Sequence, residues 1–167
     1  NKLFKRSTIS EHKIEFDPRF FMGEGLNFIV NTARKSRNTV AIDAPLYYYR
    51  RDNVKSATAS FSIKKMKNAL AAIDNISLTL GETERAIELA IAYHRWHTAF
   101  FALIAYRDHG SPKDEEEFFR DCMSYIRRNT LRLLLGAKLS RSRRLLVMAN
   151  LVSPYLAVWA YRTLKKW

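Results

Sequence analysis

The sequence predicts an α+β fold that is mostly α. Two short stretches have strand composition: residues 38–43 include Thr39, Val40 and Ile42, and residues 46–50 include three consecutive tyrosines. From about residue 61, apolar side chains recur every three or four positions, which is the spacing of one helix face. We therefore expect one or two short strands over residues 1–60, followed by a helical bundle over residues 61–167.

Local signals place the elements of the first part. Pro18 disfavours helix at the residue before it, so the segment around it is expected to be extended. An apolar stripe after Gly23 predicts a helix. In chain order we expect a short helix at 2–10, a link at 11–18, a helix from 23 to about 37, strands at 38–43 and 46–50, and a polar loop at 51–60.

Glycine, proline and serine divide the second part into helices. Gly81 is expected to end the first helix, and Pro154 to break the last segment in two. Ser111 with Pro112, and Ser153 with Pro154, have the residue types of a helix cap and first position. The predicted helices begin near residues 61, 83, 111, 140 and 153.

The positive charge is concentrated at the C-terminal end. The formal net charge is +13, and residues 122–167 hold 10 of the 29 Lys and Arg but none of the 16 Asp and Glu. A block of one sign indicates an anionic partner, either nucleic acid or anionic lipid. The apolar share of 47% excludes a disordered basic tail, and the single cysteine excludes an internal disulfide framework.

Residues 145–161 form an uncharged segment inside this basic block. A spanning helix needs about 20 apolar residues, so we expect instead two helices lying on an anionic membrane surface. A buried helical hairpin stays open as the alternative; nucleic acid is not expected, because no nucleic-acid-binding motif is present. The predicted membrane-surface residues, in a tail of about 140–167, are Arg141, Arg143, Arg144, Trp159, Arg162, Lys165, Lys166 and Trp167.

Three kinds of residue could carry chemistry. His94 and His97 have a spacing that can place two imidazoles on one metal, but no third ligand is near them, so structural histidines and no metal site are expected. Cys122 is expected to be a small core residue. Glu24 follows a glycine at a loop-to-helix junction, where it could act as a general base or simply favour the helix dipole.

Five sequence blocks in residues 1–60 resemble the second half of a bacterial family-2 glycosyltransferase. They are NKLFKR at 1–6, IEFD at 14–17, GEGLNF at 23–28, PLYYYR at 45–50 and SAT at 56–58. The resemblance implies that residues 1–60 are the acceptor-side C-terminal part of a GT-A-like α/β catalytic domain. Residues 61–167 resemble, less specifically, the helical extension that many of these enzymes carry.

The resemblance also implies an activity. Such enzymes transfer a hexose from a nucleotide-sugar donor to a glycan or lipid-linked acceptor in capsule, exopolysaccharide or cell-wall synthesis. A carboxylate deprotonates the acceptor, and a divalent metal, Mg²⁺ or Mn²⁺, stabilises the leaving diphosphate. Glu24 matches the family's glutamate. The residues that match the acceptor or diphosphate side are Tyr49, Arg50, Arg51, Ser56 and Thr58.

Two departures from the family pattern bear on activity. Gly25 stands where the family has the aspartate base, and glycine cannot take a proton. The family's nucleotide-binding half with its Asp-x-Asp metal motif does not occur in these residues. We therefore expect a piece of a longer cytoplasmic protein, peripheral on the inner face of the bacterial membrane, that is inactive and free of cofactor alone. The alternative is a non-catalytic helical module that binds membranes or dimerises, with a second copy of the chain as its partner in the latter case.

Overall fold

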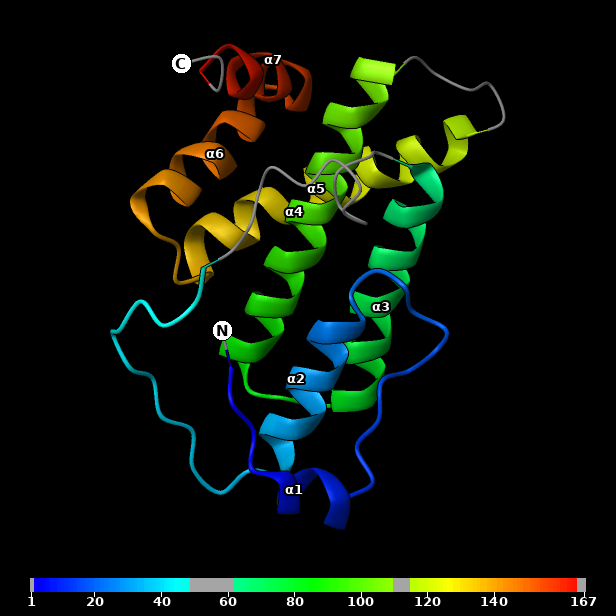
Figure 1. Ribbon diagram of the computed structural model, residues 1–167. Coiled ribbons are helices and arrows are strands. Elements are labelled where there is room, and N and C mark those ends of the chain that lie inside the picture. Colours follow the sequence, from blue (N-terminus) through cyan, green and yellow to red (C-terminus); the bar gives the residue numbers. More distant parts are fainter. Residues whose placement is uncertain (1, 49–61, 110–114, 165–167) are drawn as a thin grey trace. The chain divides into compact units, whose positions relative to one another are not determined.

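The structure, a computed structural model, describes residues 2–48, 62–109 and 115–164, and all regular secondary structure in these ranges is helical. The chain divides into two compact units, Asn1–Ala72 and Ile73–Trp167. The predicted boundary near residue 60 lies outside the described residues. The helices are α1 (Arg6–Glu11), α2 (Glu24–Lys35), α3 (Ile63–Leu80), α4 (Arg85–His109), α5 (Glu116–Gly136), α6 (Arg141–Val152) and α7 (Pro154–Leu164) (Figure 1).

The predicted α+β fold is wrong for the described residues. Residues 38–48 form neither helix nor strand, so the strands expected at 38–43 and 46–50 are not observed where the chain is described. Strand propensity takes effect only when a neighbouring strand completes the hydrogen-bond ladder, and no described segment pairs with these residues. A GT-A-like α/β domain with a sheet is therefore not the observed architecture. The apolar side chains left exposed are Val40, Ile42, Leu46, Tyr47 and Tyr48.

The first unit is built around the apolar face of α2. Phe28 is buried and contacts two aromatic rings from the preceding chain. Phe16 stacks on it with ring centroids 4.4 Å apart, and Phe4 meets it edge-on at 5.4 Å. Aromatic pairs of this geometry contribute beyond the area they bury, so they fix α2 against the segments on either side of α1.

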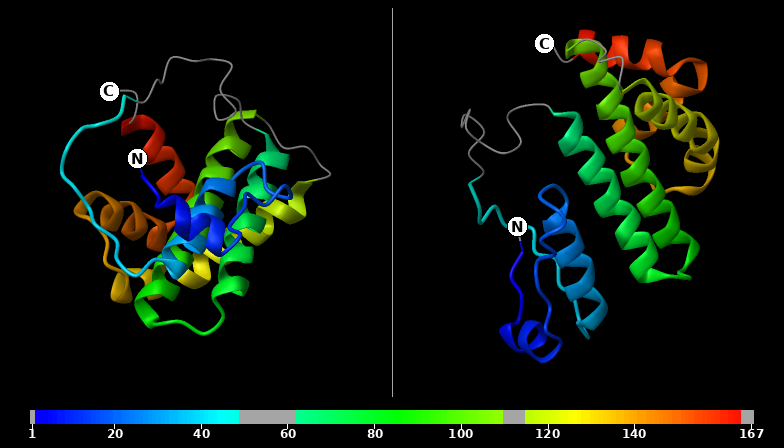
Figure 2. Two further views of the ribbon diagram at one scale, coloured as in Figure 1. Left: turned by 60° about the horizontal axis from the view of Figure 1, so that its bottom comes forward. Right: turned by 90° about the vertical axis from the view of Figure 1, so that its right-hand side faces the viewer.

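The second unit is organised around α4, with α5, α6 and α7 packed together beside it (Figures 1 and 2). Trp96 and Phe100 on α4 are fully buried and stack with centroids 5.5 Å apart. The Trp96 Nε1–H donates to Oγ1 of Thr130 on α5 at 3.0 Å, and Thr130 in turn donates to the carbonyl of Ile126 at 2.7 Å. This polar contact joins α4 and α5 inside a mainly apolar core.

The predicted helix ends are confirmed where the chain is described. Gly81 has φ +64°, a left-handed conformation that suits glycine, and it ends α3. Pro154 separates α6 from α7, and the Ser153 Oγ accepts the Leu156 N–H at 3.5 Å, as expected for a capping residue. The start signal at Ser111 and Pro112 lies outside the described residues.

Candidate functional site

The loop before α2 fixes the position of Glu24, the predicted base. The Asn68 Oδ1 accepts hydrogen bonds from the backbone N–H groups of Phe21 and Met22, both at 2.9 Å. Its Nδ2 donates to the carbonyl of Arg19 at 2.9 Å. One asparagine on α3 therefore holds three backbone groups of this loop, just before α2 begins.

Two glycines flank Glu24 and differ in their surroundings. Gly23 has φ +90°, and a Cβ there would lie 2.8 Å from the Cβ of Ala72. Nearby, the Asn27 Nδ2 donates to the Ala72 carbonyl at 3.0 Å, so α2 begins in close contact with the first part of α3. Gly25 has nothing within 4 Å of a Cβ position. Gly23 is thus required by the packing, whereas Gly25 is not.

Alanine substitutions at these two glycines are expected to act in opposite directions. Gly23→Ala should lower the free energy of unfolding by about 1–3 kcal/mol, because it adds left-handed strain and a close contact. Gly25→Ala should raise it by about 0.5–1 kcal/mol, since alanine is the better helix former. Urea denaturation followed by circular dichroism measures both. Equal effects of the two substitutions would contradict this account of the loop.

Of the residues that match the family's site, the structure describes Glu24 and Gly25. Glu24 is half-buried in the first turn of α2. Tyr49, Arg50, Arg51, Ser56 and Thr58 lie outside the described residues. Within the described ranges, no group of three His, Cys, Asp or Glu residues is placed to hold a metal ion.

His94, His97 and Cys122 have structural surroundings. The His97 ring lies 4.7 Å from that of Phe101, edge to face, and 5.7 Å from that of Tyr93. Desolvation lowers the pKa of both imidazoles, and the Arg143 charge lowers it further. Cys122 is buried, and burial raises the pKa of its thiol to about 12. A thiol with that pKa is a poor nucleophile at neutral pH.

The two imidazoles predict a pH dependence of stability. Their folded-state pKa values lie below the unfolded value of 6.5, so the unfolded chain takes up protons first as the pH falls. Stability should therefore be full above pH 6.5 and decrease below it. Urea midpoints at about pH 7.5 and about pH 5.5 measure this. The double variant His94→Gln/His97→Gln should show a smaller decrease, and an unchanged decrease would refute the assignment to these residues.

The arginines predicted to meet a membrane lie at the start of α6. Arg141, Arg143 and Arg144 are all exposed. The Arg143 guanidinium also lies 5.6 Å from the centre of the Tyr93 ring, so Arg143 contacts α4 as well as solvent. The side chain of Arg162 and residues 165–167 are outside what the structure describes, which leaves Lys165, Lys166 and Trp167 as predictions.

Helices α6 and α7 each bury one face and expose an apolar one. Val147 and Asn150 on α6, and Ala157 and Val158 on α7, are buried. The predicted alternative, a buried helical hairpin, therefore describes only the inner face of α6 and α7. We call the exposed residues the α6–α7 apolar surface: Leu145, Met148, Leu151, Val152, Tyr155, Leu156 and Trp159. No helix among the described residues is long and apolar enough to cross a membrane.

A cavity at the junction of α5 with α6 and α7 was not predicted from the sequence. Arg127, Asn150 and Ser153 are among its lining residues. In the sequence, Asn150 is only a polar interruption of an apolar segment. Its burial could not be inferred from that pattern, because it depends on how α6 packs against α5.

Comparison of the chain with models of known protein families, with curated proteins and with solved structures finds no match.

Proposed function

We propose that the chain is the membrane-attached C-terminal part of a family-2-type glycosyltransferase. The main support for membrane attachment is the α6–α7 apolar surface, which is exposed to solvent. The exposed residues Arg141 and Arg144 lie in the first turn of the same helix pair. The transferase part is supported by the five sequence blocks of residues 1–60. The donor would be a nucleotide sugar, and the acceptor a glycan or a lipid-linked glycan at the inner face of the bacterial membrane.

The spacing of the exposed residues supports attachment through α6 and α7. On α6, Leu145, Met148 and Val152 follow one another at three- and four-residue intervals, and each is exposed. On α7, Tyr155 and Trp159 are four apart and exposed. An apolar helix face with aromatic residues and adjacent arginines is typical of helices that lie in the interface of an anionic bilayer. Moving one leucine side chain completely from water into the apolar layer of the bilayer stabilises membrane binding by about 1.5–3 kcal/mol.

The local structure around Glu24 is compatible with a role as base. Glu24 is held at the start of α2 by the Asn68 hydrogen bonds to the preceding loop, and its first-turn position keeps the carboxylate near the positive end of the helix. Gly25 has open space beside it, so an aspartate would fit at the position where the family has its base.

Nucleotide release by the complete gene product tests the transferase part. With a set of sugar nucleotides and membrane extract as acceptor, turnover is expected, and Glu24→Gln should reduce it by about 10²–10⁴-fold. Glu11→Gln, an exposed charge-matched control outside the five sequence blocks, should leave it unchanged. Gly25→Asp should raise turnover if a base is missing at that position. No turnover by any form, including Gly25→Asp, would refute the enzyme assignment.

The second candidate is a non-catalytic helical module that binds membranes or dimerises. The same exposed apolar surface supports it. Vesicle binding without any sugar-nucleotide turnover would favour membrane attachment alone. A concentration-dependent dimer in analytical ultracentrifugation that the double variant Leu145→Glu/Leu156→Glu abolishes would favour self-association.

A further inference from the structure

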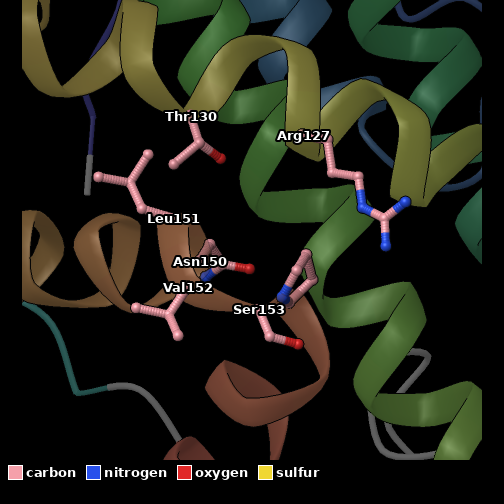
Figure 3. A pocket seen from close by; sticks show the side chains of 7 residues that line it. Arg127, Thr130, Asn150, Leu151, Val152 and Ser153 are labelled. Atoms are coloured by element: carbon pink, nitrogen blue, oxygen red, sulfur yellow. The ribbon is translucent and has the colours of Figure 1, made fainter.

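We propose that the cavity between α5 and the α6–α7 junction binds a lipid headgroup that combines a phosphodiester with a hydroxyl group, as in phosphatidylglycerol. This inference rests on the proposed membrane attachment and names the lipid chemistry that the attachment recognises. The cavity has a volume of about 280 Å³. Figure 3 shows its walls: Arg127 and Thr130 come from α5, and Asn150, Leu151, Val152 and Ser153 come from the end of α6 and the junction.

Asn150 supplies an acceptor without a partner among the described residues. Its side chain is 3% exposed, and its Nδ2 donates to the carbonyl of Leu146 at 2.9 Å, which fixes the orientation of the amide. The Oδ1 accepts no hydrogen bond from any described residue. Figure 3 shows this oxygen directed toward the side of the cavity where Arg127 and Ser153 lie. A buried acceptor left unpaired costs about 1–3 kcal/mol, so a ligand that brings a hydroxyl donor would relieve that cost.

Positive groups lie around the same cavity. Arg127 is exposed, and its guanidinium forms no ion pair with any described residue. The N-terminus of α7 also borders the cavity, where Ser153 caps the helix and Pro154 occupies its first position. The Ser153 Oγ accepts the Leu156 N–H, so its own hydroxyl hydrogen can still be donated. A guanidinium, a hydroxyl and a helix N-terminus together favour a phosphate.

The apolar neighbours distinguish a lipid from a free phosphate compound. Leu151 and Val152 line the cavity and also belong to the α6–α7 apolar surface, with Val152 81% exposed. A headgroup in the cavity would therefore have its acyl chains beside exposed apolar side chains. A soluble phosphate ester would leave those side chains in water and gain nothing from them.

Vesicle binding with two anionic lipids of equal charge tests the site. Phosphatidylglycerol offers hydroxyl donors, whereas phosphatidylmethanol is the same phosphodiester without any. At equal mole fractions in phosphatidylcholine, the protein should bind phosphatidylglycerol vesicles about tenfold more tightly, the value of one satisfied hydrogen bond. Asn150→Leu, checked for folding by circular dichroism, should remove this preference and keep binding to both. Glycerol 3-phosphate should compete weakly with either vesicle.

Two neighbouring arginines on α5 provide a matched control. Arg127→Gln should weaken binding to both anionic vesicles by more than about fivefold, through loss of the phosphate contact. Arg128→Gln makes the same change in net charge at an exposed residue that does not line the cavity, and it should have a much smaller effect.

These experiments distinguish failure of the proposed headgroup site from failure of the proposed membrane attachment. Equal binding of the two anionic vesicles, or equal effects of the two arginine variants, would overturn the headgroup site while leaving membrane attachment in place. Tight competition by glycerol 3-phosphate would overturn the lipid as ligand in favour of a soluble phosphate ester. Absence of binding to any vesicle would overturn both the site and the proposed attachment.

Discussion

Replacing Trp96 with alanine is expected to lower the free energy of unfolding by about 3–5 kcal/mol. The Trp96 side chain is 0% exposed, stacks on Phe100, and donates to the Thr130 Oγ1 that joins α4 to α5. The substitution leaves a large cavity and takes away one partner of a buried hydroxyl. Urea denaturation followed by far-ultraviolet circular dichroism measures the loss.

Trp159→Ala is the matched control for this prediction. It removes the same side chain from a site that is 55% exposed, and it should cost no more than about 1 kcal/mol. Trp96→Phe should lie between the two, because it keeps an aromatic ring and loses the hydrogen bond to Thr130. Comparable losses for the two alanine variants would contradict the assignment of Trp96 to the core of the second unit.

The double variant Leu145→Glu/Leu156→Glu is expected to reduce binding to anionic vesicles by more than about tenfold. It removes two apolar side chains from the α6–α7 apolar surface and adds two negative charges beside anionic lipid. Both leucines are exposed, so the fold should be retained. Co-sedimentation with vesicles of phosphatidylcholine and phosphatidylglycerol measures the change.

Leu78→Glu/Leu131→Glu is the matched control. It makes the same substitutions at two exposed leucines on α3 and α5, outside the α6–α7 apolar surface. It changes the net charge by the same amount as Leu145→Glu/Leu156→Glu. Its loss of vesicle binding should therefore be only the part that the added negative charge causes. If both double variants lost binding to the same extent, the attachment would be a general charge effect, and the proposed surface would be wrong.

Helices were predictable from the sequence because their signals are local. Gly81 ends a helix because glycine readily adopts the left-handed conformation, and Pro154 breaks one because proline lacks a backbone N–H; both do so in the structure. The strands were predicted wrongly over the described residues 38–48 for the opposite reason. Val40 and Ile42 have strand propensity, but a strand forms only with a partner that the described chain does not provide.

In the candidate sites, too, features set by neighbouring residues were predictable, whereas contacts between residues far apart in the sequence were not. The local pattern around Glu24 correctly indicated a helix start, and Cys122 was correctly expected in the core. No local pattern could reveal that Asn68 holds the loop before α2, since that contact joins residues 47 positions apart. The burial of Asn150 and its place beside Arg127 in one cavity likewise depend on the packing of α6 against α5.

Sedimentation of the wild-type protein with vesicles is the most direct test of the proposed membrane attachment. We expect binding to vesicles that contain phosphatidylglycerol, weak binding to pure phosphatidylcholine, and a partial loss at high salt, because apolar insertion remains when charge is screened. Absence of binding to either vesicle, together with salt-sensitive binding to DNA, would show that the basic C-terminal block serves a nucleic acid and would contradict the proposal.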